Sequence, residues 1–201
     1  MHGKLRPALI WAIVLLAGLG PLVIAVQSPL LAWRQGIYIL AGFAGILGLG
    51  LLLLQPLLAA GLMPGLAAPR WRWVHRLGGI ALTCCIALHV IGLWVTSPPD
   101  MVDALLFRAP TWFSVWGVLA MWLAFGAAGF GLMHRSLHIP PRIWRRAHGG
   151  LGIAVAALTV AHVVPIDGTM ELYSKWALCG LIVLASLHLA RHIFRPRNKS
   201  Q

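Results

Sequence analysis

Long apolar runs alternate with short polar or proline-containing connections along almost the whole chain. Six runs are long enough to cross a bilayer core of about 30 Å as helices. We predict spans at roughly 7–26, 35–58, 74–95, 113–133, 146–164 and 175–194. The runs lack the two-residue alternation of barrel strands, so the expected fold is an all-α integral membrane bundle. We expect residues 1–201 to form a single domain of six transmembrane helices.

Composition agrees with this pattern. Hydrophobic residues make up 60% of the 201 residues, and charged residues only 10%. These proportions are typical of a membrane protein and exclude an ordinary water-soluble domain. The three cysteines, Cys84, Cys85 and Cys179, lie inside apolar runs and form no C-x-x-C motif. We therefore expect them to be packing residues rather than a dithiol or a covalent heme attachment.

The positive charges fall unevenly on the two sides of the predicted bundle. Three of the 16 Lys and Arg residues, Arg34, Arg108 and Lys175, lie on one side with all four acids. The remaining 13 lie on the side of the two termini, which predicts that both termini are cytoplasmic. The formal net charge of +12 is then a topology signal and a match to anionic lipid. We expect no nucleic-acid binding, because no soluble segment is large enough to carry it.

Two predicted spans carry histidine pairs with the same spacing. His75 and His89 lie in the third span, and His148 and His162 lie in the fifth. In a helix, 14 residues separate two side chains by only about 40° around the axis and by about 21 Å along it. The third and fifth spans run in the same direction. We therefore expect one histidine of each pair near the cytoplasmic face and one near the outer face.

Four intramembrane histidines at equal spacing favour a ligand, because ionisable groups at this depth are costly and usually functional. We predict that they are metal ligands to two b-type hemes. The inner heme would be held by His75 and His148, and the outer heme by His89 and His162. Two axial imidazoles leave no open position at the iron, which suits electron transport. Packing or interfacial positions would explain a single histidine more easily than four.

Small and basic residues surround the inner pair. Gly79 and Gly152 lie one turn after the inner histidines on the same helical face, where a glycine lets a flat macrocycle approach the backbone. Four arginines nearby can hold heme propionates by charge-assisted bonds: Arg72, Arg76, Arg145 and Arg146. Anchoring at the cytoplasmic surface explains these arginines equally well.

Other polar and small residues have simpler interpretations. His188 and His192 share one face at the end of the last span. They can help to bind a flavin, a quinone or a partner, but an interfacial helix end also tolerates histidine. His134 and His138 are expected to be solvated in a loop. Two sets of glycines predict close helix packing: Gly42, Gly45 and Gly48, and Gly126 and Gly129.

The six spans and the histidine pairs in spans three and five resemble the ferric reductase-like transmembrane domain. That superfamily includes ferric reductases, NADPH oxidases and the heme subunit of the bacterial periplasmic methionine sulfoxide reductase system. The resemblance implies that His75, His89, His148 and His162 are bis-heme ligands. It also implies electron flow from a cytoplasmic reduced flavin, through the inner and then the outer heme, to ferric iron or a periplasmic redox protein.

Residues 196–201 are all that follows the last predicted span, so the chain resembles stand-alone bacterial members of that superfamily. This implies a separate electron donor, with FMN or FAD bound to this chain or to an NAD(P)H reductase partner.

Three alternative functions remain open. The chain can be a quinol-linked cytochrome b subunit or a methionine sulfoxide reductase-type heme subunit. It can be a transporter whose histidines relay protons. It can also be a structural membrane anchor for a partner enzyme.

Overall fold

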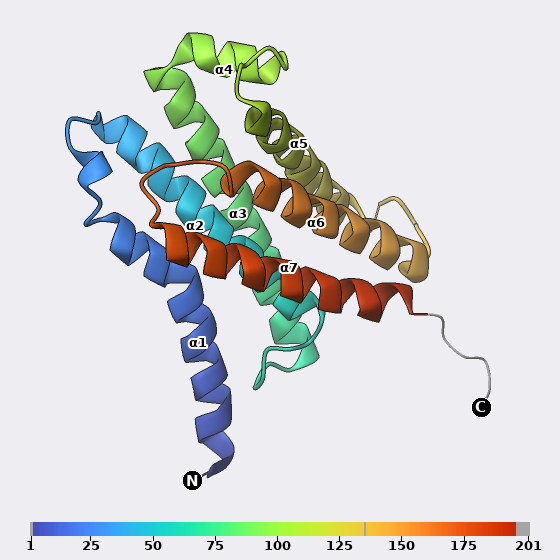
Figure 1. The fold of residues 1–201 in the computed structure, drawn as a ribbon. Helices are drawn as coiled ribbons and strands as arrows, with labels where there is room; N and C mark the ends of the chain where they lie inside the picture. Colours follow the sequence, from blue (N-terminus) through green and yellow to red (C-terminus); the bar gives the residue numbers. More distant parts are fainter. Residues whose placement is uncertain (1, 135, 196–201) are drawn as a thin grey trace, which may run out of the picture.

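The computed structural model describes residues 2–134 and 136–195 of the chain, and these residues are all-helical (Figure 1). Seven α-helices and one short 3-10 helix follow one another in the described part: α1 (His2–Ala25), η1 (Pro29–Leu31), α2 (Gly36–Ala59), α3 (Ala68–Thr96), α4 (Pro98–Leu105), α5 (Trp112–Met133), α6 (Pro141–Val163) and α7 (Leu172–Phe194).

Each predicted span coincides with one long helix. Five of these helices, α1, α2, α3, α5 and α7, are long and apolar enough to cross a membrane. Helix α6 has 23 residues but is not among the five. Its sequence explains this, because Arg142, Arg145 and Arg146 and two histidines lower its mean hydropathy. These helices are consistent with a multi-pass membrane protein.

Five of the six long helices begin earlier than the apolar runs that predicted them, and α2 begins one residue later. Helix α3 starts at Ala68 and α6 at Pro141, five or six residues before the expected spans. Both have a proline in the first turn, where its missing N–H costs no hydrogen bond. The same effect explains α4, which we expected to be only a connection. Its first turn contains Pro98, Pro99 and Asp100, and a carboxylate there interacts well with the helix N-terminus.

The long helices form two neighbouring pairs (Figure 1). Helix α2 packs most extensively against α3, and α5 against α6. Helix α7 packs against α1, α2 and α6, and α4 lies across one end between α3 and α5. Buried side chains from four helices meet at the centre, including Leu52 of α2, Ala124 of α5, Val155 of α6 and Ile182 of α7. The core therefore lies where α7 joins the two pairs.

Helix α7 begins with a capping carboxylate. Glu171 accepts hydrogen bonds from the backbone N–H groups of Tyr173 at 2.7 Å and Ser174 at 2.8 Å. These bonds hold the pKa of Glu171 below its ordinary value of 4.5, and the bond from Ser174 contributes most. A carboxyl with a lowered folded-state pKa contributes stability above its unfolded pKa. That contribution is lost as the pH falls through the lowered value.

Glu171→Gln is therefore expected to lower the melting temperature slightly at neutral pH. The difference from the natural protein should shrink as the pH falls below about 4.5, because the natural carboxyl then becomes protonated as well. Thermal unfolding in detergent, followed by circular dichroism, measures this effect. Asp167→Asn, which changes an acid of the same connection, is the matched control. A difference that is the same at pH 7 and at pH 3 would contradict the assigned cap.

Candidate functional site

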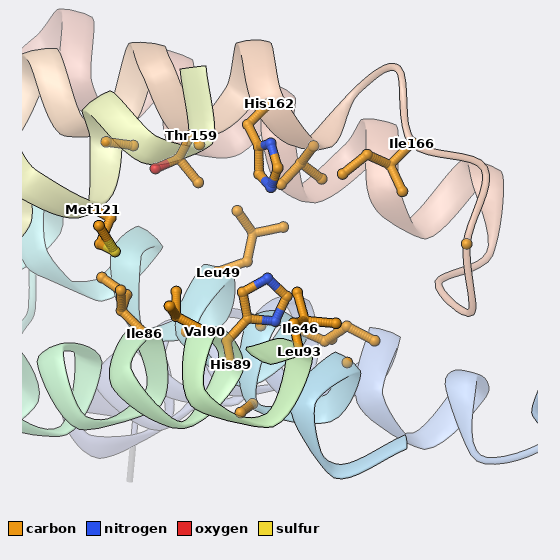
Figure 2. Close-up of a pocket in the computed structure, with 18 of the residues that line it drawn as sticks. Ile46, Leu49, Ile86, His89, Val90, Leu93, Met121, Thr159, His162 and Ile166 are labelled. Atoms are coloured by element: carbon orange, nitrogen blue, oxygen red, sulfur yellow. The ribbon is translucent and has the colours of Figure 1, made fainter. Parts of the chain in front are cut away.

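Two of the four predicted ligands face each other across one cavity. His89 enters it from α3 and His162 from α6, and Figure 2 shows the two rings pointing toward one another from opposite walls. The cavity has a volume of about 410 Å³ and is lined mainly by apolar side chains of α2, α3, α5 and α6. This volume lies within the range of small-molecule sites, roughly 300–1,000 Å³. The pairing expected for the outer site therefore brings both histidines to a shared, apolar cavity.

Each of these imidazoles is tied to a backbone carbonyl through the same ring atom. Nδ1 of His89 lies 2.8 Å from the carbonyl oxygen of Ala41, and Nδ1 of His162 lies 3.0 Å from that of Phe113. A carbonyl only accepts, so Nδ1 carries the proton in both rings and Nε2 keeps its lone pair. Metal-binding histidines commonly have this arrangement, in which a backbone carbonyl fixes the ring and its tautomer.

A glycine makes room for each ring. Gly45 lies one turn after Ala41 on α2, and Gly117 lies one turn after Phe113 on α5. A Cβ atom at Gly45 would lie 3.0 Å from Nδ1 of His89, and a Cβ at Gly117 would lie 2.7 Å from Nδ1 of His162. A Cβ at Gly117 would force the ring of His162 to shift, and a Cβ at Gly45 would press closely on the ring of His89. We did not single out Gly117 from the sequence, and we had assigned Gly45 to helix packing alone.

The prediction that spaced glycines allow close helix packing holds at one set of positions and fails at the other. Gly48 does support close approach of α2 and α3, since its Cβ would lie 3.5 Å from Cβ of Cys85. Gly126 and Gly129 have open space around them, with nothing within 4 Å of an added Cβ. The prediction of close packing at these two positions is wrong. Their spacing matches a helix interface, but that face of α5 has no neighbour there.

The other two predicted ligands also meet. The ring centroids of His75 on α3 and His148 on α6 lie 6.1 Å apart, with their planes at 74°. Two imidazoles bound to opposite sides of one metal through bonds of about 2 Å would have centroids about 6 Å apart. The separation of this inner pair is therefore compatible with one metal ion between them.

Aromatic rings enclose His148. Trp144 stacks on it with centroids 5.1 Å apart and planes at 8°, and Phe130 lies at 6.5 Å. Nδ1 of His148 and Nε1 of Trp144 are buried without a hydrogen-bond partner. A Cβ at Gly131 would lie 3.3 Å from Cε1 of His148, which repeats the glycine contact of the outer pair. The two orphaned nitrogens mark this as a polar position still lacking a partner.

Gln55 of α2 is a neighbour of the inner pair that the sequence analysis missed. With its amide turned to satisfy the surrounding groups, its Nε2 donates to Nδ1 of His75 at 3.0 Å and to the His75 carbonyl at 3.1 Å, and its Oε1 accepts from the Gly79 N–H at 3.3 Å. In this orientation Nδ1 of His75 accepts and Nε2 carries the proton. With the amide oxygen toward the ring instead, Nδ1 would carry the proton and Nε2 would be free to bind a metal. The sequence did contain a signal for Gln55, because it is a polar residue within an apolar run.

The remaining predicted site residues lie around the inner pair without clear contacts to it. Gly79 faces Gln55, with an added Cβ 3.8 Å from the end of the Gln55 amide, while Gly152 has nothing within 4 Å. All four arginines are exposed, and the guanidinium of Arg72 lies over the Trp71 ring at 5.7 Å. These arginines are Arg72, Arg76, Arg145 and Arg146. Surface anchoring explains them as well as propionate binding does.

The additional histidines separate into two groups. His188 and His192 are exposed on α7 and do not line the cavity. His138 is exposed, as expected for a loop residue. His134 is partly buried. The centroid of its ring lies 4.9 Å from that of Trp144, and its Nδ1 lies 2.9 Å from the Gly131 carbonyl oxygen. The expectation that His134 is solvated is wrong, because the helix end brings it against the aromatic stack.

Within residues 2–134 and 136–195, no group of three or more His, Cys, Asp or Glu side chains is placed to hold a metal ion. Comparison of the chain with models of protein families, with curated proteins and with solved structures gives no match. What the chain does is therefore inferred from the geometry of its own residues.

Proposed function

We propose that this chain is a diheme b-type membrane protein that transfers electrons. It would carry them from a cytoplasmic reduced flavin or reductase partner to ferric iron or a redox protein on the outer side. One observation carries the proposal. His89 and His162 face one apolar cavity from two helices, with Nδ1 of each ring tied to a backbone carbonyl. That arrangement leaves two Nε2 lone pairs directed at one site.

The apolar lining of the cavity supports the proposal of a heme. A porphyrin is flat and largely apolar, and the walls between His89 and His162 are apolar, including Leu49, Ile86 and Val90 (Figure 2). Gly45 and Gly117 keep the two rings seated against α2 and α5. Heme iron held by two imidazoles supplies reversible one-electron transfer without an open position for oxygen.

The protein's own groups do the positioning. The carbonyls of Ala41 and Phe113 hold each ring in one orientation and one tautomer, and they increase the basicity of Nε2. The apolar lining excludes water from the site. The inner pair would hold the second heme, because His75 and His148 are 14 residues before His89 and His162 on the same two helices. Two sites about 21 Å apart along these helices would then lie one above the other across the membrane.

The membrane topology is part of the proposal. We propose six spans, counting α6, with both termini cytoplasmic in a bacterial inner membrane. The extensive packing of α6 against α5 and α7 supports a span, despite its lower hydropathy. The uneven distribution of Lys and Arg supports the orientation. Among these cations, Arg135, Arg197, Lys199 and the side chain of Lys4 lie outside the described residues.

We also propose that the chain is a relative of the ferric reductase-like transmembrane domain. The support is the four histidines on two helices and their arrangement into two facing pairs. A quinol-linked subunit would need a second binding site. His188 and His192, the residues considered for it, are exposed and lie apart from the cavity lining.

The direction of electron flow is tested by removing the inner pair. His148→Ala is expected to remove one heme and to slow reduction of the other by a cytoplasmic donor by at least tenfold, because the first acceptor is missing. Inside-out membrane vesicles supplied with reduced FMN, followed at the heme α-band, measure this rate. His188→Ala, which changes an exposed histidine of α7, is the control. Unchanged reduction of the remaining heme would overturn the proposed order.

A further inference from the structure

Lys175 is a buried cation with an incomplete set of partners. Its side chain is 3% exposed, and Lys175 and Ser186 are the two buried polar residues found in the described part of the chain. Its Nζ donates to the carbonyl oxygen of Ile166 at 2.7 Å. An ammonium group has three N–H donors, so two remain to be satisfied. A buried charge without a counter-ion is costly, which points to a ligand of opposite charge.

The side chain also lines the cavity that contains His89 and His162. It lies at the end where Ile166 closes the wall, because its ammonium group bonds to the Ile166 carbonyl. In Figure 2, Ile166 lies toward one end of the cavity and Met121 and Ile86 toward the other. The polar residues Ser114 and Thr169 line the cavity too. The cavity therefore combines apolar walls with one cation near one end.

The acids of the protein do not neutralise this cation inside the cavity. None of the four acids is among the residues that line it: Asp100, Asp103, Asp167 and Glu171. The Glu171 carboxylate instead accepts from the backbone N–H groups of Tyr173 and Ser174. A ligand that is apolar over most of its surface and carries a carboxylate on one edge would complement both features.

We propose that Lys175 binds a carboxylate at this end of the cavity, and that the carboxylate is a propionate of the outer heme; this rests on the proposed function. The heme would then be oriented with its propionate edge toward Ile166 and the first turn of α7. Its apolar edge would face Met121 and Ile86. Lys175 would be a positioning residue that also raises the outer heme's midpoint potential, since a nearby cation favours the more negative reduced state.

The test compares Lys175→Met with Arg108→Met in the purified full-length protein. Arg108 is an exposed cation that does not line the cavity and is predicted on the same side of the membrane. In Lys175→Met, we expect one of the two components of a redox titration to shift to lower potential. The propionate bending band in the resonance Raman spectrum should shift as well. Arg108→Met should leave both unchanged, and Lys175→Arg should retain the natural potential.

The outcomes separate this inference from the proposed function. Two hemes with an unchanged titration and an unchanged propionate band in Lys175→Met would overturn the role of Lys175 alone. An unchanged propionate band, with a potential that responds to added acetate only when Lys175 is present, would assign the site to a free carboxylate instead. Absence of heme from the natural protein would overturn both proposals. If Lys175→Met does not accumulate in membranes, Lys175→Gln provides the same neutral comparison.

Discussion

Replacing His162 with alanine is expected to remove the outer heme and leave the inner heme in place. The heme content should fall from about two to about one per chain, because the proposed outer site would keep only one of its two imidazoles. A lone His89 would then face an apolar cavity that offers no second imidazole. A pyridine hemochrome assay on the purified variant measures the content. Electron paramagnetic resonance should show the loss of one of two low-spin signals.

His188→Ala is the matched control, because it removes an exposed histidine from α7 that does not line the cavity. It should retain both hemes. Two hemes in His162→Ala would contradict the assignment of His162 as an axial ligand. Loss of both hemes, with the protein still folded by circular dichroism, would show that the two sites do not assemble independently.

The second large effect is expected from a single added methyl group. In Gly117→Ala, the new Cβ would lie 2.7 Å from Nδ1 of His162, closer than real contacts permit. The imidazole would have to leave the Phe113 carbonyl and move within the cavity. We expect occupancy of the outer site to fall several-fold, with a weakened low-spin signal from the heme that remains. Heme content and the low-spin spectrum measure this effect.

Gly126→Ala on the same helix is the control, because an added Cβ there has nothing within 4 Å. Alanine favours a helix over glycine by about 1 kcal/mol at either position, so helix propensity alone would make both variants more stable. A loss of heme specific to Gly117→Ala therefore reports the contact with His162. Equal heme content in both variants would show that the ring can shift without losing its ligand, and would contradict this role for Gly117.

Much of the fold follows from local pattern. The six long helices lie where apolar runs of membrane-spanning length occur, because such runs satisfy their backbone hydrogen bonds within one segment. Their polar ends were underestimated, since α3 and α6 extend through basic residues to a proline in the first turn. Helix α4 was missed because Pro98 and Pro99 were interpreted as a connection, although proline is well tolerated where a helix begins.

The pairing of the histidines could also be predicted. Equal spacing on two helices that run in the same direction leaves only one pairing that joins equal depths. The structure accordingly brings His75 to His148 and places His89 and His162 at one cavity. Ligation itself remains a proposal, because periodicity fixes which side chains share a face but not what lies between them.

The supporting residues could not be predicted, because their roles depend on contacts between helices. Gly117, Gln55 and Lys175 matter through partners far away in sequence. The structure reveals a regularity among such partners. On α2, Ala41 and Gln55, which are 14 residues apart, contact the two histidines of α3. On α5, Gly117 and Gly131, also 14 residues apart, lie against His162 and His148. The spacing of the histidines is thus repeated on the helices that hold them.

The central claim is that the four histidines bind two b-type hemes. The most direct measurement is a pyridine hemochrome assay on the natural protein, purified in detergent from cells supplied with heme. The account predicts about two b-type hemes per chain, one for each histidine pair. Protein that is folded and free of heme would contradict it, and would favour a transporter whose intramembrane histidines relay protons.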